Sequence, residues 1–257
     1  LFMDIVNSTT NFTDFLDQAK IKFIEINKSL IEIQKRKISK YNFKDIKWYK
    51  NLTFKSDIPN IIYSNEFFDC FPVRQFFFNR KWHEKYVGYN EEEDKFYFIE
   101  KIVKSAKLLS MLNLYKEDKL LEISFERNTY FEKVCKLLQK NGGVFFTVDY
   151  GYVKNIKNFT LQAVQNHKFS HLLENIGQKD VSSHVNFNDF INIAKKYNLK
   201  IDEFSSQKEF LIKYGIFKRK DKLLNSDNSE LIESELNKLI SDKEMGNLFK
   251  VLVVSNL

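Results

Sequence analysis

The hydrophobic pattern of the chain consists of short apolar runs that alternate with stretches of helical periodicity. The runs are typical of buried strands and fall at 21–26, 43–48, 58–63, 144–148, 200–204 and 249–254. The helical stretches fall at 2–16, 29–38, 128–140, 188–197 and 230–240. This alternation indicates an α/β fold. We expect the last run, 249–254, to close one edge of the sheet.

Two segments depart from this pattern. Residues 73–78, 81–89 and 95–99 alternate as strands do, and an acidic turn separates the last two. We interpret about 73–100 as a small antiparallel β insertion. Residues 160–184 lack a regular period, and long irregular segments are often functional lids. We expect about 153–187 to form a helical or irregular cap over a substrate channel, within a single domain that covers 1–257.

The most distinctive stretch follows the run at 58–63. Asn65, Glu66 and Asp69 arrive together there, among phenylalanines. In an open α/β sheet, polar groups at the carboxyl end of a strand face the crevice where ligands bind. The structural alternatives are that Glu66 begins a helix and that Asp69 caps a turn.

Length, charge and cysteine content narrow the possible functions. The 257 residues suffice for one α/β domain, and the net charge is +7. The lysines are scattered apart from the run 218–220, which disfavours a nucleic-acid partner. Cys70 and Cys135 provide neither a disulfide framework nor a metal site, so we expect no metal and a reducing compartment. No apolar run is long enough for a membrane span, and we expect no signal peptide.

Several motifs resemble those of one family. Residues 65–73 match N-E-F-F-D-x-x-P-V of the MidA family, which are class I S-adenosylmethionine-dependent methyltransferases. Further segments resemble family motifs in the same order: G-G-x-x-L-x-x-D-Y-G-Y at 142–152, L-Q-A-V at 161–164, D-L-T-x-H-V-D-F at 180–187 and M-G-x-x-F-K-V-L at 245–252. The match at 180–187 is partial, because the chain reads D-V-S-S-H-V-N-F there and Asn186 replaces the usual Asp. The resemblance therefore covers nearly the whole chain.

The resemblance implies a Rossmann-like class I methyltransferase sheet with helices on both faces. It also implies S-adenosyl-L-methionine as the cofactor and an enzyme that methylates an arginine of a protein. The expected client is a subunit of respiratory complex I or a similar protein. The expected compartment is the cytoplasm in a bacterium or the mitochondrial matrix in a eukaryote. The alternatives are a non-catalytic assembly scaffold with the same fold and a nucleic-acid methyltransferase. The turn at Glu66, which has no adjacent prolines, disfavours the latter.

The start of the chain departs from the family pattern. Relatives carry a glycine-rich loop, E-x-G-P-G-x-G-T-L, after their first strand, and Leu1 aligns with its last letter. We therefore expect the chain to be a fragment that lacks the first strand and this loop.

The resemblance and the strand ends together suggest cofactor-binding residues. Glu25 lies near the end of the run at 21–26, where a carboxylate can accept hydrogen bonds from the ribose hydroxyls. An exposed strand-end glutamate is the alternative. Trp48 could enclose the adenine or anchor the core. Asn65 would place the cofactor or the target nitrogen.

Glu66 and Asp69 are the candidate catalytic residues, because two carboxylates three positions apart can grip a guanidinium. Asp149 and Tyr150 follow the run at 144–148 and would lie at the same sheet edge, where Asp149 orients the substrate or caps a turn. His167 and His184 are candidates for hydrogen bonding in the cap, and a structural role is the alternative for each.

Overall fold

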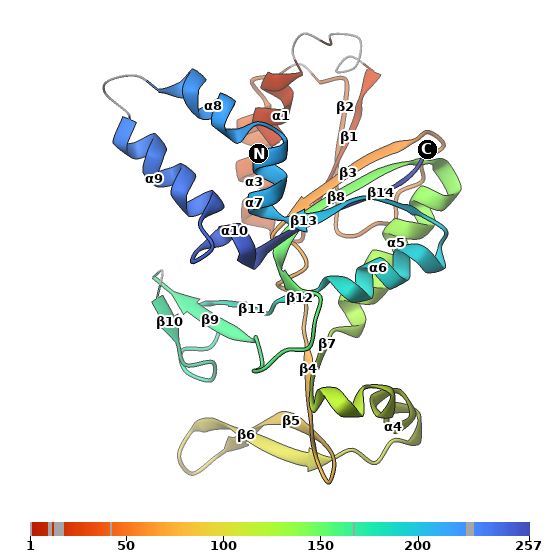
Figure 1. The fold of residues 1–257 in the computed structure, drawn as a ribbon, viewed down its shortest axis with the longest axis vertical. Helices are drawn as coiled ribbons and strands as arrows, with labels where there is room; N and C mark the ends of the chain where they lie inside the picture. Colours follow the sequence, from red (N-terminus) through yellow and green to blue (C-terminus); the bar gives the residue numbers. More distant parts are fainter. Residues whose placement is uncertain (1, 10–11, 13–17, 42, 167, 225–228) are drawn as a thin grey trace. The chain divides into compact units, whose positions relative to one another are not determined.

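The computed structural model describes the chain except for residues 1, 10, 11, 13–17, 42, 167 and 225–228. The chain divides into two compact units, Leu1–Asp57 and Ile58–Leu257 (Figure 1).

The first unit is built around two parallel strands. Its elements are α1 (Phe2–Ser8), β1 (Lys20–Ile24), α3 (Lys28–Ile38) and β2 (Asp45–Tyr49), and β1 pairs with β2. The Asn27 side chain begins α3 by accepting hydrogen bonds from the amides of Ser29 and Leu30. Both strands and this helix confirm the prediction. The helix expected at 2–16 is present from Phe2 to Ser8, and residues 10, 11 and 13–17 lie outside the described part.

The second unit contains a five-stranded sheet. Its strands are β3 (Asn60–Asn65), β8 (Gly143–Tyr152), β12 (Val185–Asn186), β13 (Lys200–Ser206) and β14 (Phe249–Asn256). The order is β12-β8-β14-β13, and β3 also pairs with β8. Strands β3 and β12 run parallel to β8, whereas β14 is antiparallel to β8 and to β13.

The last strand therefore lies inside this sheet, and the prediction that it closes an edge is wrong. Val251, Leu252 and Val254 of β14 are fully buried. Burial on both faces is expected for a strand that pairs with a strand on each side in a sheet whose two faces are covered by helices. The apolar run at 249–254 is typical of a strand in this interior position.

Helices cover both faces of the sheet, as expected. Successive residues of a strand point to opposite faces of the sheet. On β8, the Phe145 ring packs on Phe131 of α5 (Phe125–Asn141), with 5.7 Å between the ring centroids. The neighbouring Phe146 contacts Phe210 of α7 (Gln207–Lys213) at 5.5 Å. Helix α6 (Phe187–Lys196) packs on α5 through stacked rings of Phe190 and Phe131. Helices α8 (Ile216–Leu223), α9 (Ser229–Ile240) and α10 (Met245–Leu248) follow α7 along the chain.

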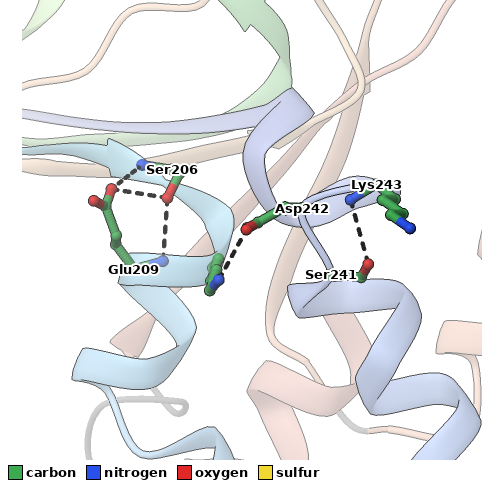
Figure 2. A network of polar contacts seen from close by, with 6 residues as sticks. Ser206, Glu209, Ser241, Asp242 and Lys243 are labelled. Carbon is green, nitrogen blue, oxygen red and sulfur yellow. Dashed lines mark hydrogen bonds and ion pairs between the residues drawn. The ribbon is translucent and has the colours of Figure 1, made fainter.

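Helix α7 begins directly after β13 in a capping box. The Glu209 amide donates to Ser206 Oγ, and the Glu209 carboxylate accepts from the Ser206 amide and hydroxyl (Figure 2). Lys208 on the same turn binds Asp242 at 2.9 Å, which connects α7 to the segment after α9. These contacts fix how the chain leaves the sheet.

A separate four-stranded antiparallel sheet follows the first sheet strand of this unit. It contains β4 (Arg74–Asn79), β5 (Lys81–Asn90), β6 (Lys95–Ile102) and β7 (Leu120–Ile123), in the order β6-β5-β4-β7. Helix α4 (Ala106–Leu112) and a 3₁₀ helix, η1 (Asn113–Asp118), precede β7. Phe76, Trp82, Val103 and Leu112 form its core. The three strands predicted at 73–99 are confirmed.

The segment expected to be helical or irregular is more regular than predicted. Strands β9 (Gln162–Gln165), β10 (Lys168–Ser170) and β11 (Asp180–Ser182) form an antiparallel sheet with β9 in the middle. These strands are three or four residues long, which is too short for a clear local period. Pairing between distant segments therefore decides their structure.

Over the described parts of the chain, no helix combines the length and the apolar character that crossing a membrane requires.

Candidate functional site

The site begins where β3 ends. The Glu66 backbone is left-handed, with φ of 48°, and its amide donates to the Val148 carbonyl at 3.0 Å. A glutamate rarely adopts this conformation, which therefore needs support from its surroundings. Asp149 provides it, because one carboxylate oxygen accepts from the amides of Phe67 at 3.2 Å and Phe68 at 2.8 Å. The turn after β3 is thus fastened to the neighbouring strand.

The Glu66 carboxylate is exposed and is held on both oxygens. The Tyr150 hydroxyl donates to Glu66 Oε2 at 3.1 Å, and the side-chain amide of Asn65 donates to Glu66 Oε1 at 3.2 Å. The Tyr150 ring packs on Phe249 at 4.2 Å and lies parallel to the His184 ring at 6.2 Å. Burial and the nearby Glu66 charge raise the pKa of Tyr150 far above its usual range, so the hydroxyl remains a donor. Burial lowers the pKa of His184.

Two further carboxyls lie behind Glu66. Asp69 is 8% exposed, and burial followed by the negative charges of Glu66 and Asp180 raises its pKa to about 6. Asp149 is fully buried, and burial followed by the charge of Asp69 raises its pKa to about 7. A cation that binds beside such acidic groups relieves their mutual repulsion and stabilises their ionised forms.

Arg127 is a residue that the sequence reasoning missed. It is 3% exposed and belongs to the first turn of α5, where the Ser124 hydroxyl accepts from its amide. Its guanidinium donates to the Phe68 carbonyl of the turn after β3 and to the carbonyls of Ser183 and His184. The available signal was an arginine at a helix start, where the helix dipole disfavours a cation.

The structure brings together six of the sequence-predicted residues at the ends of β3 and β8. These are Asn65, Glu66, Asp69, Asp149, Tyr150 and His184. They come from segments up to about 120 residues apart in the sequence. His167 lies outside the described residues.

The first unit holds the two remaining candidates, Glu25 and Trp48. Glu25 directly follows β1, and its carboxylate accepts from the Asn27 amide at 2.9 Å and the Gln34 side chain at 3.3 Å. Gln34 in turn accepts from the Trp48 indole at 2.9 Å. Trp48 is half-buried and stacks on Phe23. One glutamine therefore links both predicted cofactor residues.

Across the described residues, no three acidic, histidine or cysteine side chains gather as a metal site would require.

Solved structures define the class of this fold. Two crystal structures of proteins from Burkholderia thailandensis superimpose with a TM-score of 0.78 each, at 20% and 21% identity. They match 92% of this chain, which covers 66% and 64% of theirs, and one of them is bound to S-adenosyl-homocysteine. The fold is therefore the Rossmann-like methyltransferase fold.

The sequence comparison supplies the family. A family model described as "Putative S-adenosyl-L-methionine-dependent methyltransferase" matches residues 1–205, and the chain belongs to this family. This finding confirms the resemblance seen in the motifs and the cofactor that it implied.

Curated relatives carry more specific names. A protein of Caenorhabditis elegans, named as a mitochondrial homolog of protein arginine methyltransferase NDUFAF7, is 27% identical over 97% of this chain. The mitochondrial protein arginine methyltransferase NDUFAF7 of Xenopus tropicalis is 24% identical over 90%. The chain spans 63% and 54% of the lengths of these two proteins.

Proposed function

We propose that this protein transfers a methyl group from S-adenosyl-L-methionine to an arginine side chain of a protein substrate. The observation that carries the proposal is the Glu66 carboxylate, which is exposed at the end of β3 and oriented by Asn65 and Tyr150. A guanidinium binds a carboxylate through two parallel hydrogen bonds. The names of the two curated relatives support the same substrate class.

The carboxyls would act by holding and orienting the guanidinium. Bound S-adenosyl-L-methionine would supply the methyl group from its sulfonium, which would become the neutral thioether of S-adenosylhomocysteine. The target nitrogen would gain the methyl group and give up one proton to solvent, so that the substrate remains a guanidinium cation. Glu66 would grip the far side of the guanidinium and draw its positive charge there. Holding the nitrogen at attack distance can lower the activation barrier by roughly several kcal/mol.

Asp69 would complete the guanidinium clamp from behind. Because it is 8% exposed, it acts on the substrate through its negative charge more than through direct contact. Asn65 would position the target nitrogen or the cofactor. We assign Glu25 to the ribose hydroxyls and Trp48 to the adenine, since a carboxylate at the end of β1 fits the ribose position of this fold.

We further propose the wider setting of this activity. The chain would be one methyltransferase domain in which the β4–β7 sheet is the insertion and residues 153–187 form the cap. The client would be a subunit of respiratory complex I or a similar protein, as the resemblance to the MidA family implies. In a eukaryote the site of action would be the mitochondrial matrix, since both curated relatives are named as mitochondrial.

A single substitution tests the role of Glu66. Glu66→Gln keeps the shape of the side chain and removes its charge, whereas Glu91→Gln makes the same change in the exposed turn between β5 and β6. The assays are transfer of labelled methyl to arginine-containing proteins and calorimetric binding of S-adenosylhomocysteine. We expect Glu66→Gln to lower the transfer rate about 100-fold, with nearly unchanged affinity for S-adenosylhomocysteine. Glu91→Gln should behave as the wild type.

Two results would count against the proposal. If Glu66→Gln combined with Asp69→Asn left methyl transfer unchanged, the clamp would be wrong. If the wild type neither bound S-adenosylhomocysteine nor transferred methyl groups, the scaffold alternative would become the better account. Where the coding sequence continues upstream, the longer product is measured in parallel.

A further inference from the structure

Arg127 is a buried cation whose hydrogen bonds go to carbonyl and hydroxyl oxygens, while the carboxylates of Asp149, Glu122 and Asp69 act on it through their charge. Its guanidinium donates to the Phe68 carbonyl at 2.7 Å, the His184 carbonyl at 3.0 Å, the Ser183 carbonyl at 3.4 Å and Ser183 Oγ at 2.8 Å. Burying a charge is costly unless its hydrogen bonds are satisfied, and the start of a helix adds an unfavourable dipole. A residue placed against these rules indicates a specific task.

The acceptors of Arg127 belong to two segments that are distant in the sequence. Phe68 lies in the turn after β3, and Ser183 and His184 lie between β11 and β12. The Ser183 amide also donates to the Asp69 carbonyl at 3.0 Å. One guanidinium and one backbone hydrogen bond therefore join the acidic turn to the segment 183–184.

The same junction reaches the Glu66 carboxylate. Arg127 binds the carbonyl of His184, whose amide donates to Thr160 Oγ1 at 2.8 Å, so the backbone of His184 is held on both sides. Glu122 of β7 in turn binds the amide and hydroxyl of Thr160. The His184 ring lies against Tyr150, which donates to Glu66. A continuous series of contacts thus connects Arg127 with the exposed carboxylate.

We propose that Arg127 is a positioning residue of the methyltransferase site, which fixes the acidic turn against residues 183–184 so that Glu66 meets the substrate cation in one orientation. This role rests on the proposed function and deepens it, because it explains what holds the carboxylate in place. Arg127 itself does not contact Glu66. Its effect passes through the backbone of the turn and through the His184–Tyr150 ring pair.

The charge of Arg127 has a second effect on the site. It lowers the pKa values of Asp69 and Asp149, against the burial that raises both. Asp69 also faces the negative charges of Glu66 and Asp180, and Asp149 faces Asp69. A neutral side chain at position 127 would raise both pKa values further. The acid limb of the rate, expected near pH 6 where Asp69 ionises, would then move to higher pH.

Three variants separate the two effects. Arg127→Met removes the donors and the charge, Arg127→Lys keeps the charge without the planar fork, and Lys133→Met removes an exposed charge from the same helix. The measurements are hydrogen exchange of the Ser183 amide, the dependence of methyl transfer on pH, and affinity for S-adenosylhomocysteine. The Ser183 amide reports the junction directly and needs no activity.

We expect Arg127→Met to exchange the Ser183 amide at least tenfold faster and to lower kcat at least tenfold. Its acid limb should move upward, while affinity for S-adenosylhomocysteine stays within about twofold. Arg127→Lys should speed the exchange but keep the acid limb near that of the wild type, and it covers the case in which Arg127→Met fails to fold. Lys133→Met should change nothing.

Unchanged Ser183 exchange in the arginine variants would overturn the proposed junction. A loss of stability with kcat per folded molecule and acid limb unchanged would also overturn it, because it would reduce Arg127 to a purely structural residue. If the wild type showed no methyl transfer while the exchange rose as expected, the proposed function would fail and the junction between the turn and Ser183 would stand.

Discussion

The strongest test of the site's construction is the removal of the Asp149 carboxylate. In Asp149→Ala the amides of Phe67, Phe68 and Tyr150 lose their acceptor, and Phe68 is 1% exposed. A buried donor left unpaired costs about 1–3 kcal/mol. Because the amides of Phe67 and Tyr150 are only partly buried, we expect a loss of about 2–4 kcal/mol in the free energy of unfolding at pH 5, where the Asp149 carboxyl with its pKa of about 7 carries little charge.

Asp149→Asn separates the hydrogen bonds from the charge. The amide oxygen can still accept from the amides of Phe67 and Phe68, and the side chain no longer ionises. The Tyr150 amide, which donates to the other Asp149 oxygen at 3.0 Å, loses its acceptor at every pH, so this cost does not alter the dependence of stability on pH. The pKa of Asp149 is about 7 in the folded protein and about 3.9 in an unfolded chain. The folded state therefore binds the proton more tightly, and wild-type stability falls as pH rises from about 4 through 7. Asp149→Asn lacks this loss, so it should gain on the wild type between pH 5 and pH 8.

The assay is urea unfolding followed by circular dichroism at pH 5 and pH 8, together with hydrogen exchange of the Phe68 amide. Asp221→Asn, a change in an exposed aspartate of α8, serves as the matched control. A loss below about 0.5 kcal/mol in Asp149→Ala at pH 5 would place it among ordinary surface substitutions and refute the reasoning. So would a wild type and an Asp149→Asn variant with the same dependence on pH.

Two other substitutions test neighbouring contacts. Tyr150→Phe removes the hydroxyl that donates to Glu66 at 3.1 Å. We expect an unchanged fold and a several-fold lower rate constant of methyl transfer in single-turnover measurements. An unchanged rate constant would show that Glu66 needs no support from Tyr150. Gly151→Ala places a Cβ 2.4 Å from the Phe187 ring and 2.6 Å from the Val185 carbonyl. We expect a loss of about 1–3 kcal/mol, measured as a lower Tm, and an unaltered Tm would contradict this crowding.

Local patterns predicted most elements of the sheet and its helices, but not the full length of β8. The apolar run ends at Val148, and the strand continues to Tyr152. The continuation depends on distant strands, because β14 pairs with Asp149 and Tyr150, and β12 pairs with Gly151 and Tyr152. Similarly, the position of β14 between β8 and β13 is a long-range property. Periodicity describes which face of a segment is buried and does not identify its partner.

The candidate site shows the same division. Glu66, Asp69 and Asp149 could be found because each follows an apolar run, and the end of such a run is a local feature of the sequence. The role of Asp149 could not be decided between substrate and turn, and the structure shows it fastening the turn. Arg127 escaped notice because its acceptors lie 56 to 59 residues away, and because apolar spacing places the helix start at Asn128. The capping Ser124 moves that start forward to Phe125.

One edge of β8 is shared by two strands, and this has a consequence for how the protein can change. Strand β3 pairs with Gly143–Val148, and β12 pairs with Gly151 and Tyr152, so each strand finds its register independently. Between these two pairings lie Asp149 and Tyr150 of β8, and we call this place the notch. The chain leaves the sheet here after β3 and returns here before β12, with β8 itself in between. The β4–β7 sheet before β8 and the residues between β8 and β12 can each be lengthened, shortened or exchanged without shifting either pairing. New recognition surfaces could thus be grafted beside an unaltered acidic strand end, which makes the notch the natural place for diversification and for engineering.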